Sequence, residues 1–323
     1  FYFSLLLIIS YFTGEESNES FFNANKSSPW YLVAFGMIGA SLSGVTFISV
    51  PGWVENSQFS YFQMVLGYTV GYFFIGKILL PLYYRMNLTS IYTYLDNRFG
   101  ANSYVTGASF FLISRVIGAS FRLFLVANVM QLLVFDELNI PYWITVTFTI
   151  ILIWIYTFKS GIKTIVWTDT LQTLFMLVAV FFTIFKIIEL LNIDFSSVIF
   201  ELSNNQKTKI FFFENVKESN FFWKQFISGA FIAIVMTGLD QDMMQKNLTC
   251  KSLKDAQKNM FWFTLVLVLV NFLFLALGYL LTEYASLNKI SANKDNLFPT
   301  IANLSEMGVI VSATFILGLI AAA

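Results

Sequence analysis

The sequence predicts an all-α polytopic membrane protein, and three observations lead to this fold class. Of its 323 residues, 57% are hydrophobic and only 12% are charged, which is about half the charged fraction of soluble domains. The mean hydropathy is +0.70. Apolar stretches of roughly twenty residues, the length that crosses a bilayer as a helix, recur along the whole chain. We therefore expect a series of membrane helices with the lipid bilayer as a partner.

These apolar stretches define about nine predicted spans. Backbone groups in hydrocarbon must be paired internally, and segments this long achieve that only as helices. We expect the first and the last span to be cut by the ends of the sequence, because residues 1–12 lack the basic start and cleavage site of a signal peptide. The predicted spans are 1–12, 30–50, 60–84, 103–134, 141–158, 163–190, 223–239, 260–282 and 307–323.

Basic residues in the short loops predict the orientation. They fall on alternate connections, which should be cytoplasmic and which place the N-terminus outside a multi-pass protein of the cell membrane. The loop at 13–29, with three Glu and one Lys, fits this topology poorly. The basic loop residues are Arg85, Arg98, Lys159, Lys163, Lys246, Lys251, Lys254 and Lys258.

Composition also excludes several functions. The sequence has no histidine, one cysteine (Cys250) and a net charge of zero. A metalloprotease motif, a histidine base and a zinc cluster are thereby ruled out, and nothing favours nucleic acid as a partner. We expect the chain not to be an enzyme.

Helix-breaking and hydroxyl residues interrupt the second span. The stretch Gly39 to Thr46 contains Ser41, Ser43 and Gly44, and Pro51-Gly52 follows it. Local unwinding here would offer carbonyls to a cation and hydroxyls to a solute. The alternative is that the small residues only allow close helix packing.

Among the charged residues inside predicted spans, where charge is costly, Asp169, Arg115 and Arg122 stand out. Asp169 shares a helix face with Gln172, an oxygen-rich setting suited to sodium, although the carboxylate could instead relay a proton or pair with an arginine. Arg115 and Arg122 share a face of the 103–134 span. Arg122 lies deeper and needs an anion, either Asp169 or the carboxylate of a solute, whereas Arg115 is expected to form a structural ion pair.

At these residues the chain resembles the sodium:solute symporter family, which includes sodium/glucose, sodium/proline, sodium/sialic acid and sodium/iodide transporters. The most specific match is Gly238 to Gln241 with Gln245, Lys251 and Ser252, which is similar to the family pattern G-x-N/D-Q…Q-[RK]…K-S. The other matching segments are Phe21-Phe22, Pro29 to Val33, Ser41 to Gly44, Pro51-Gly52, Leu80 to Arg85, Thr89 to Tyr92, Arg98 to Gly100 and Trp167 to Gln172.

The resemblance implies the leucine-transporter fold, in which two inverted five-helix repeats surround a central site. Residues 1–29 would be the end of a peripheral helix and a cytoplasmic loop. Residues 30–190 would form the first repeat, 191–222 an extracellular loop, and 223–323 the first three helices of an incomplete second repeat.

The resemblance also implies roles for individual residues. The carbonyls of Gly39 and Leu42 match sodium ligands, with the Ala322 carbonyl as a third, and Asp169 matches an acidic residue that supports a second sodium in some members. Ser41, Ser43 and Thr46 match positions that line the solute pocket. Arg122 resembles the arginine that meets the carboxylate in sialic acid members. Met236 and Thr46 depart from the pattern of sugar transporters, which argues against a neutral hexose.

We therefore expect a secondary active symporter that imports a small organic solute with sodium, with a preference for a carboxylate such as sialic acid or a monocarboxylate. The alternative is a sensor in which the same helical bundle reports solute to a C-terminal signalling module.

Overall fold

The computed structural model describes Leu5, Ile8, Ile9, Phe12 and residues 24–88, 90–157, 162–292 and 294–321. Apart from a single bridge between Ser28 and Cys250, these residues form helices and connections. The main helices are α3 (Trp30–Ser41), α4 (Gly44–Ser57), α5 (Tyr61–Phe74), α6 (Leu80–Arg85), α7 (Ile91–Phe99), α8 (Ala101–Met130), α9 (Tyr142–Thr157), α10 (Ile162–Leu191), α11 (Phe195–Asn204), α12 (Phe222–Ala233), α13 (Gln241–Leu248), α14 (Leu253–Leu287), α15 (Leu297–Ala302) and α16 (Gly308–Ala321). Short helical segments join them: η1 (Ala24–Lys26), η2 (Ile75–Leu79), η3 (Gln131–Phe135), η4 (Gln206–Thr208), η5 (Ile234–Gly238), η6 (Lys294–Asn296) and η7 (Ser305–Met307).

Four helices in the described residues are long and apolar enough to cross a membrane alone. They run over Tyr61–Arg85, Ala101–Met130, Thr164–Leu191 and Leu253–Leu287. Three further spans form if bent pairs are joined, and α9 is a shorter apolar helix. Every predicted span from residue 30 onward thus coincides with helix, while most of the predicted span 1–12 lies outside the described residues.

Two of the bent pairs begin the two predicted repeats. The axes of α3 and α4 differ by 56°, and those of α12–η5 and α13 differ by 66°. Between α3 and α4, Leu42 and Ser43 leave helical geometry, with ψ angles of 82° and 170°. Asp240 begins α13, and its side chain accepts the Met243 N–H at 3.1 Å, which is an N-cap. Both spans are therefore interrupted at polar, loop-forming residues.

Glycines set the close packing around these broken helices. An added Cβ at Gly39 would overlap Thr173 and the Asp169 carbonyl on α10, and one at Gly67 would overlap the Phe226 carbonyl on α12. Such contacts between small residues and backbone are typical of membrane helix interfaces. They bring α3 against α10 and α5 against α12.

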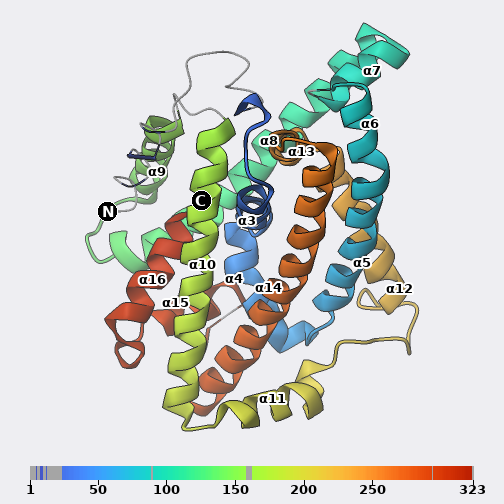
Figure 1. Cartoon of the computed structure of the whole chain (residues 1–323). Coiled ribbons are helices and arrows are strands. Elements are labelled where there is room, and N and C mark those ends of the chain that lie inside the picture. The colour runs from blue at the N-terminus through green and yellow to red at the C-terminus, as the bar shows by residue number, and fades with distance from the viewer. Residues whose placement is uncertain are drawn as a thin grey trace.

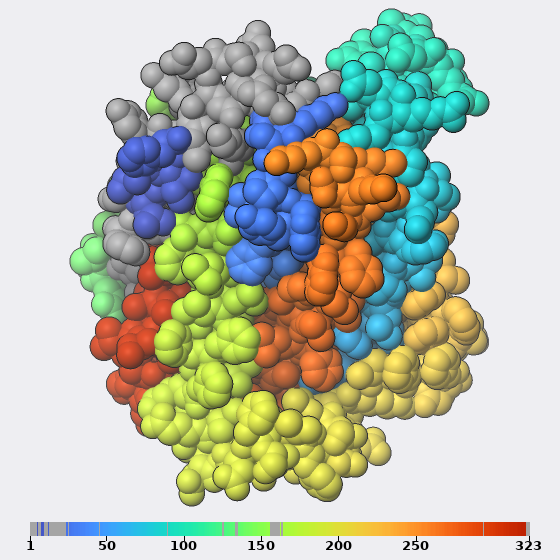
Figure 2. Space-filling view, in the orientation of Figure 1, coloured from blue at the N-terminus to red at the C-terminus, as the bar shows by residue number. Residues whose placement is uncertain are grey.

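Figure 1 shows the long helices running in broadly the same direction, with α7 at one end of the molecule and α11 lying across the other. In Figure 2, α3, α10 and α14 lie side by side on one face. Behind the break, Phe47 of α4 packs against Phe274, Phe298 and Phe315 with ring centroids 6.1, 5.2 and 5.4 Å away. This aromatic cluster joins α4, α14, α15 and α16.

Candidate functional site

The two helix breaks meet at Tyr72 of α5. Its hydroxyl interacts with Ser41 at the end of α3 and with Thr237 of η5. The ring packs edge-on against Phe263 of α14, with centroids 4.9 Å apart, and Tyr72 is 5% exposed. Three hydroxyl groups from three elements are thus gathered beside the two helix breaks.

The carbonyl end of α3 can hold a cation. The last carbonyls of a helix lack intrahelical donors and carry partial negative charge. The Gly39 carbonyl accepts the Gln172 side-chain amide at 3.1 Å, and the described residues supply no hydrogen bond to the Leu42 carbonyl. Oxygen atoms are the ligands that hard cations such as sodium prefer, so the two predicted carbonyl ligands fit an ion.

The third predicted sodium ligand, Ala322, lies outside the described residues. The helix that leads to it, α16, approaches the break, because an added Cβ at Gly318 would lie 3.2 Å from the Phe47 ring and 3.4 Å from the Phe175 carbonyl. The last turns of α16 therefore pack against α4 and the middle of α10.

The other predicted solute-pocket residues lie just beyond the break. Ser43 precedes α4 and its carbonyl accepts the Phe47 N–H at 3.0 Å, while Thr46 lies in the first turn of α4. Both are partly buried. Their hydroxyls form no hydrogen bond with the described residues, so they are available to a solute.

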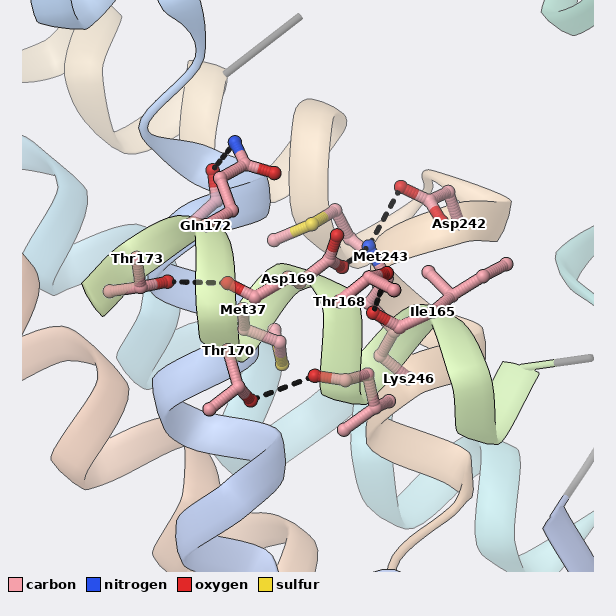
Figure 3. Close-up of polar contacts among 12 residues, drawn as sticks. Met37, Ile165, Thr168, Asp169, Thr170, Gln172, Thr173, Asp242, Met243 and Lys246 are labelled. Carbon is pink, nitrogen blue, oxygen red and sulfur yellow. Dashed lines mark hydrogen bonds and ion pairs between the residues drawn. The ribbon is translucent and has the colours of Figure 1, made fainter. Parts of the chain in front are cut away.

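Asp169 of α10 faces α13, where it meets a lysine (Figure 3). The Lys246 Nζ lies 2.7 Å from Asp169 Oδ2 and 3.2 Å from Asp242 Oδ2, and the Lys246 side chain is only 3% exposed. Asp169 is paired directly with the Lys246 ammonium. The structural partner of Asp169 is thus Lys246 and not the arginine considered from sequence.

The two arginines of α8 have different surroundings. Arg115 forms an ion pair with Asp240, as expected of a structural arginine. Arg122 is partly buried and makes no ion pair with the described carboxylates. Its charged neighbours are Arg115, Asp240 and Asp242. Arg122 and Asp169 are therefore not brought together as a pair.

A cavity of about 690 Å³ opens between α4 and α8. Its lining includes Glu55 and Asn56 on α4 and Phe124 and Asn128 on α8, and the η6 segment closes one side. Arg122 is not among its lining residues and, two positions before Phe124, lies on a different face of α8. The volume of the cavity suits a small organic solute.

Three residues of this candidate site were not predicted as site residues from sequence. Tyr72 carries no signal that separates it from the many other aromatic residues in the spans, and Thr237 belongs to a polar stretch, continued by Gly238 to Asp242, that a simple helix end also explains. Lys246 belonged to the matched Gln-Arg/Lys pattern, but it was assigned to a cytoplasmic loop and not to a buried ion pair. Met236, which departs from the sugar-transporter pattern, is 66% exposed.

Sequence comparisons place this geometry in a known family. The model of the sodium:solute symporter family matches residues 21–323. The human sodium/iodide cotransporter is 22% identical over 76% of this chain and 37% of its own length. The sodium/sialic acid symporter NanT of Aliivibrio fischeri is 26% identical over 85% of this chain and 54% of its own length. The mouse sodium-coupled monocarboxylate transporter 2 is 26% identical over 70% of this chain and 36% of its own length.

The chain thus spans between about a third and about half of the length of these relatives. Among solved structures, the substrate-bound, outward-open state of a Na⁺-coupled sialic acid symporter superposes with a TM-score of 0.85 at 18% identity, covering 99% of this chain and 67% of that one. This likeness confirms the predicted leucine-transporter-like helical membrane fold, and the family match agrees with the expectation of a transporter and not an enzyme. The chain belongs to the sodium:solute symporter family.

Proposed function

We propose that this chain forms the core of a symporter that imports a small organic anion together with sodium. The observation that carries the proposal is the meeting of two broken helices, where the open carbonyl end of α3 lies beside the hydroxyls of Ser41, Tyr72 and Thr237. The carbonyl oxygens suit a cation, and the neighbouring hydroxyls suit a polar solute. The family named for this activity supports the same reading.

Sodium would be held by the carbonyls of Gly39 and Leu42, with Ala322 as the third ligand. The ion supplies a positive charge at the negative end of the α3 dipole. Ser43 and Thr46 belong to the α4 side of the same break, so an ion on one side and a solute on the other both favour one angle between α3 and α4. A ligand shifts a conformational equilibrium only through such a difference in affinity, which is the requirement for coupling.

The anionic solute is inferred from Arg122 and from the relatives. The Arg122 side chain is partly buried and has no direct ion pair with the described residues. The relatives are named for iodide, monocarboxylates and sialic acid, all of which are anions. We propose that Arg122 pairs with a carboxylate of the solute.

The proposed orientation places the end with α7 and residues 249–252 in the cytoplasm. Lys26 donates to Asn87 at 3.2 Å and the Ser28 N–H to the Thr249 carbonyl at 3.2 Å. These contacts put residues 24–28 at the same end as the basic connections after α6 and α13. Positive charge is retained on the cytoplasmic side, so the cavity beside Glu55 would open outward.

The test is uptake into proteoliposomes that contain the full-length transporter, with a panel of sialic acids, monocarboxylates, amino acids and sugars. We expect a sodium gradient to drive uptake of a carboxylate and a potassium gradient to have no such effect. Equal uptake with either ion would refute sodium coupling, and solute binding without uptake would favour a sensor.

Arg122→Ala tests the anion preference. Loss of one charge-assisted pair should lower kcat/KM for the carboxylate by roughly 10- to 100-fold, about 1.5–3 kcal/mol. Arg98→Ala removes an exposed arginine on α7 and is the matched control. An Arg122→Ala variant that kept full uptake of every carboxylate would overturn the preference.

A further inference from the structure

The buried lysine on α13 bears on how many sodium ions this transporter binds. The resemblance to the family offers Asp169 as the carboxylate of a second sodium site, and this role can be tested against the residues that surround it. The Lys246 Nζ lies 2.7 Å from Asp169 Oδ2 and the lysine side chain is 3% exposed. One oxygen of this carboxylate is therefore already in contact with a cation.

The nearby charges leave no excess for another ion. Within the described residues the cluster contains three carboxylates and three cationic groups, which interact across α8, α10 and α13. In their ordinary charge states they sum to zero. In the absence of the anionic solute, a further cation would leave this cluster with a net positive charge. The six groups are Asp169, Asp240, Asp242, Arg115, Arg122 and Lys246.

The lysine is also held in place from its own helix. Lys246 donates to Asp242 Oδ2 at 3.2 Å, one turn earlier on α13, and residues separated by four positions share a helix face. The Lys246 side chain is 3% exposed, so its ammonium is kept from solvent in this arrangement. A second sodium at Asp169 therefore does not fit this arrangement.

We propose that the Lys246 ammonium replaces a second sodium at Asp169, so that the transporter binds a single sodium, at the carbonyl end of α3. This proposal rests on the proposed function, because it assumes that the Gly39 and Leu42 site takes sodium. It adds that the positive charge at Asp169 belongs to the protein and is carried on α13 throughout the cycle.

Equilibrium binding of radioactive sodium to the purified full-length protein gives the number of ions directly. A parallel measurement follows the thermal unfolding temperature as sodium chloride replaces choline chloride at constant ionic strength, since a bound ion stabilises the folded state. We expect one ion for the wild type and for Asp169→Asn. Lys246→Gln leaves Asp169 and Asp242 without their ammonium, so we expect it to bind two.

Two controls make the assignment specific. The double variant Lys246→Gln/Asp169→Asn should return to one ion, because the second site requires the free carboxylate. Lys258→Gln removes an exposed ammonium near the start of α14 and should leave the count at one.

Two ions in the wild type, falling to one in Asp169→Asn, would overturn this proposal and leave the proposed function standing. A wild type that binds no sodium would overturn both. If Lys246→Gln does not fold, the comparison of wild type with Asp169→Asn still decides between one site and two.

Discussion

At the scale of single residues, Cys250 shows how burial controls reactivity. It is the sequence's only cysteine, it is 0% exposed, and its carbonyl accepts the Tyr84 hydroxyl at 3.1 Å. Burial, with a smaller effect of Asp255, raises the pKa of the Cys250 thiol to about 12. Only the thiolate reacts with maleimides, so we expect peptide-resolved labelling of Cys250 at pH 8 to be at least about 100-fold slower in the folded protein than in denaturant.

The raised pKa of the Cys250 thiol also makes the stability of the folded state depend on pH. The folded state keeps its proton up to a higher pH than the unfolded chain, whose cysteine pKa is about 8.5. The stabilisation is therefore complete below about pH 8.5 and is lost progressively as the pH rises toward 12. Cys250→Ser should reduce this alkaline dependence. Equal labelling rates in folded and denatured protein would contradict the buried position.

The sequence predicted single residues best where they break the rules of the membrane. Arg122 and Asp169 stand out as charges within apolar spans, and Ser41 and Ser43 as hydroxyls beside Gly44. Their partners could not be predicted in the same way. Lys246 is 77 positions from Asp169 in the printed sequence, and only the packing of α13 against α10 decides which of many lysines meets that carboxylate.

At the scale of elements, α5 and α12 depend on contact between their backbones. An added Cβ at Gly67 would overlap the Phe226 carbonyl, and one at Gly229 would overlap the Met64 carbonyl. Gly67→Val should force the helices apart and lower the free energy of unfolding by about 1–3 kcal/mol, which thermal unfolding in detergent would measure. Gly118→Val is the control, since nothing lies within 4 Å of an added Cβ there. Equal unfolding temperatures would show that α5 and α12 do not need this contact.

Spans were predictable because hydrocarbon demands long apolar helices, whereas bends depend on neighbours. Gly44 indicated the first interruption, and Gly238 to Gln241, at the second, was recognised as a family match. The pair formed by η6–α15 and α16, bent by 59°, was not predicted, because residues 283–306 are too polar to resemble a span. Its position comes from tertiary contact, with the Phe298 ring 4.6 Å from Phe315.

At the scale of the whole molecule, one buried amide fastens the connection between α11 and α12 to the helical bundle. Gln63 of α5 is 0% exposed. Its Nε2 donates to the Asn220 carbonyl at 2.8 Å, and its Oε1 accepts the Phe212 N–H at 3.0 Å. The two ends of the segment 212–220 are thus tied to the same side chain, and this connection links the two predicted repeats.

Gln63→Leu removes both ties while keeping the side-chain volume similar. Each backbone group left without a partner costs about 1–3 kcal/mol, so we expect local opening of residues 211–222 and faster amide exchange there, with α10 and α14 unaffected. Hydrogen–deuterium exchange with peptide resolution measures this. Gln257→Leu, which loses a single bond of 2.8 Å to the Gly76 carbonyl, should leave exchange in residues 211–222 unchanged. If exchange in Gln63→Leu rose equally in every helix, the amide would support the global fold and not this connection.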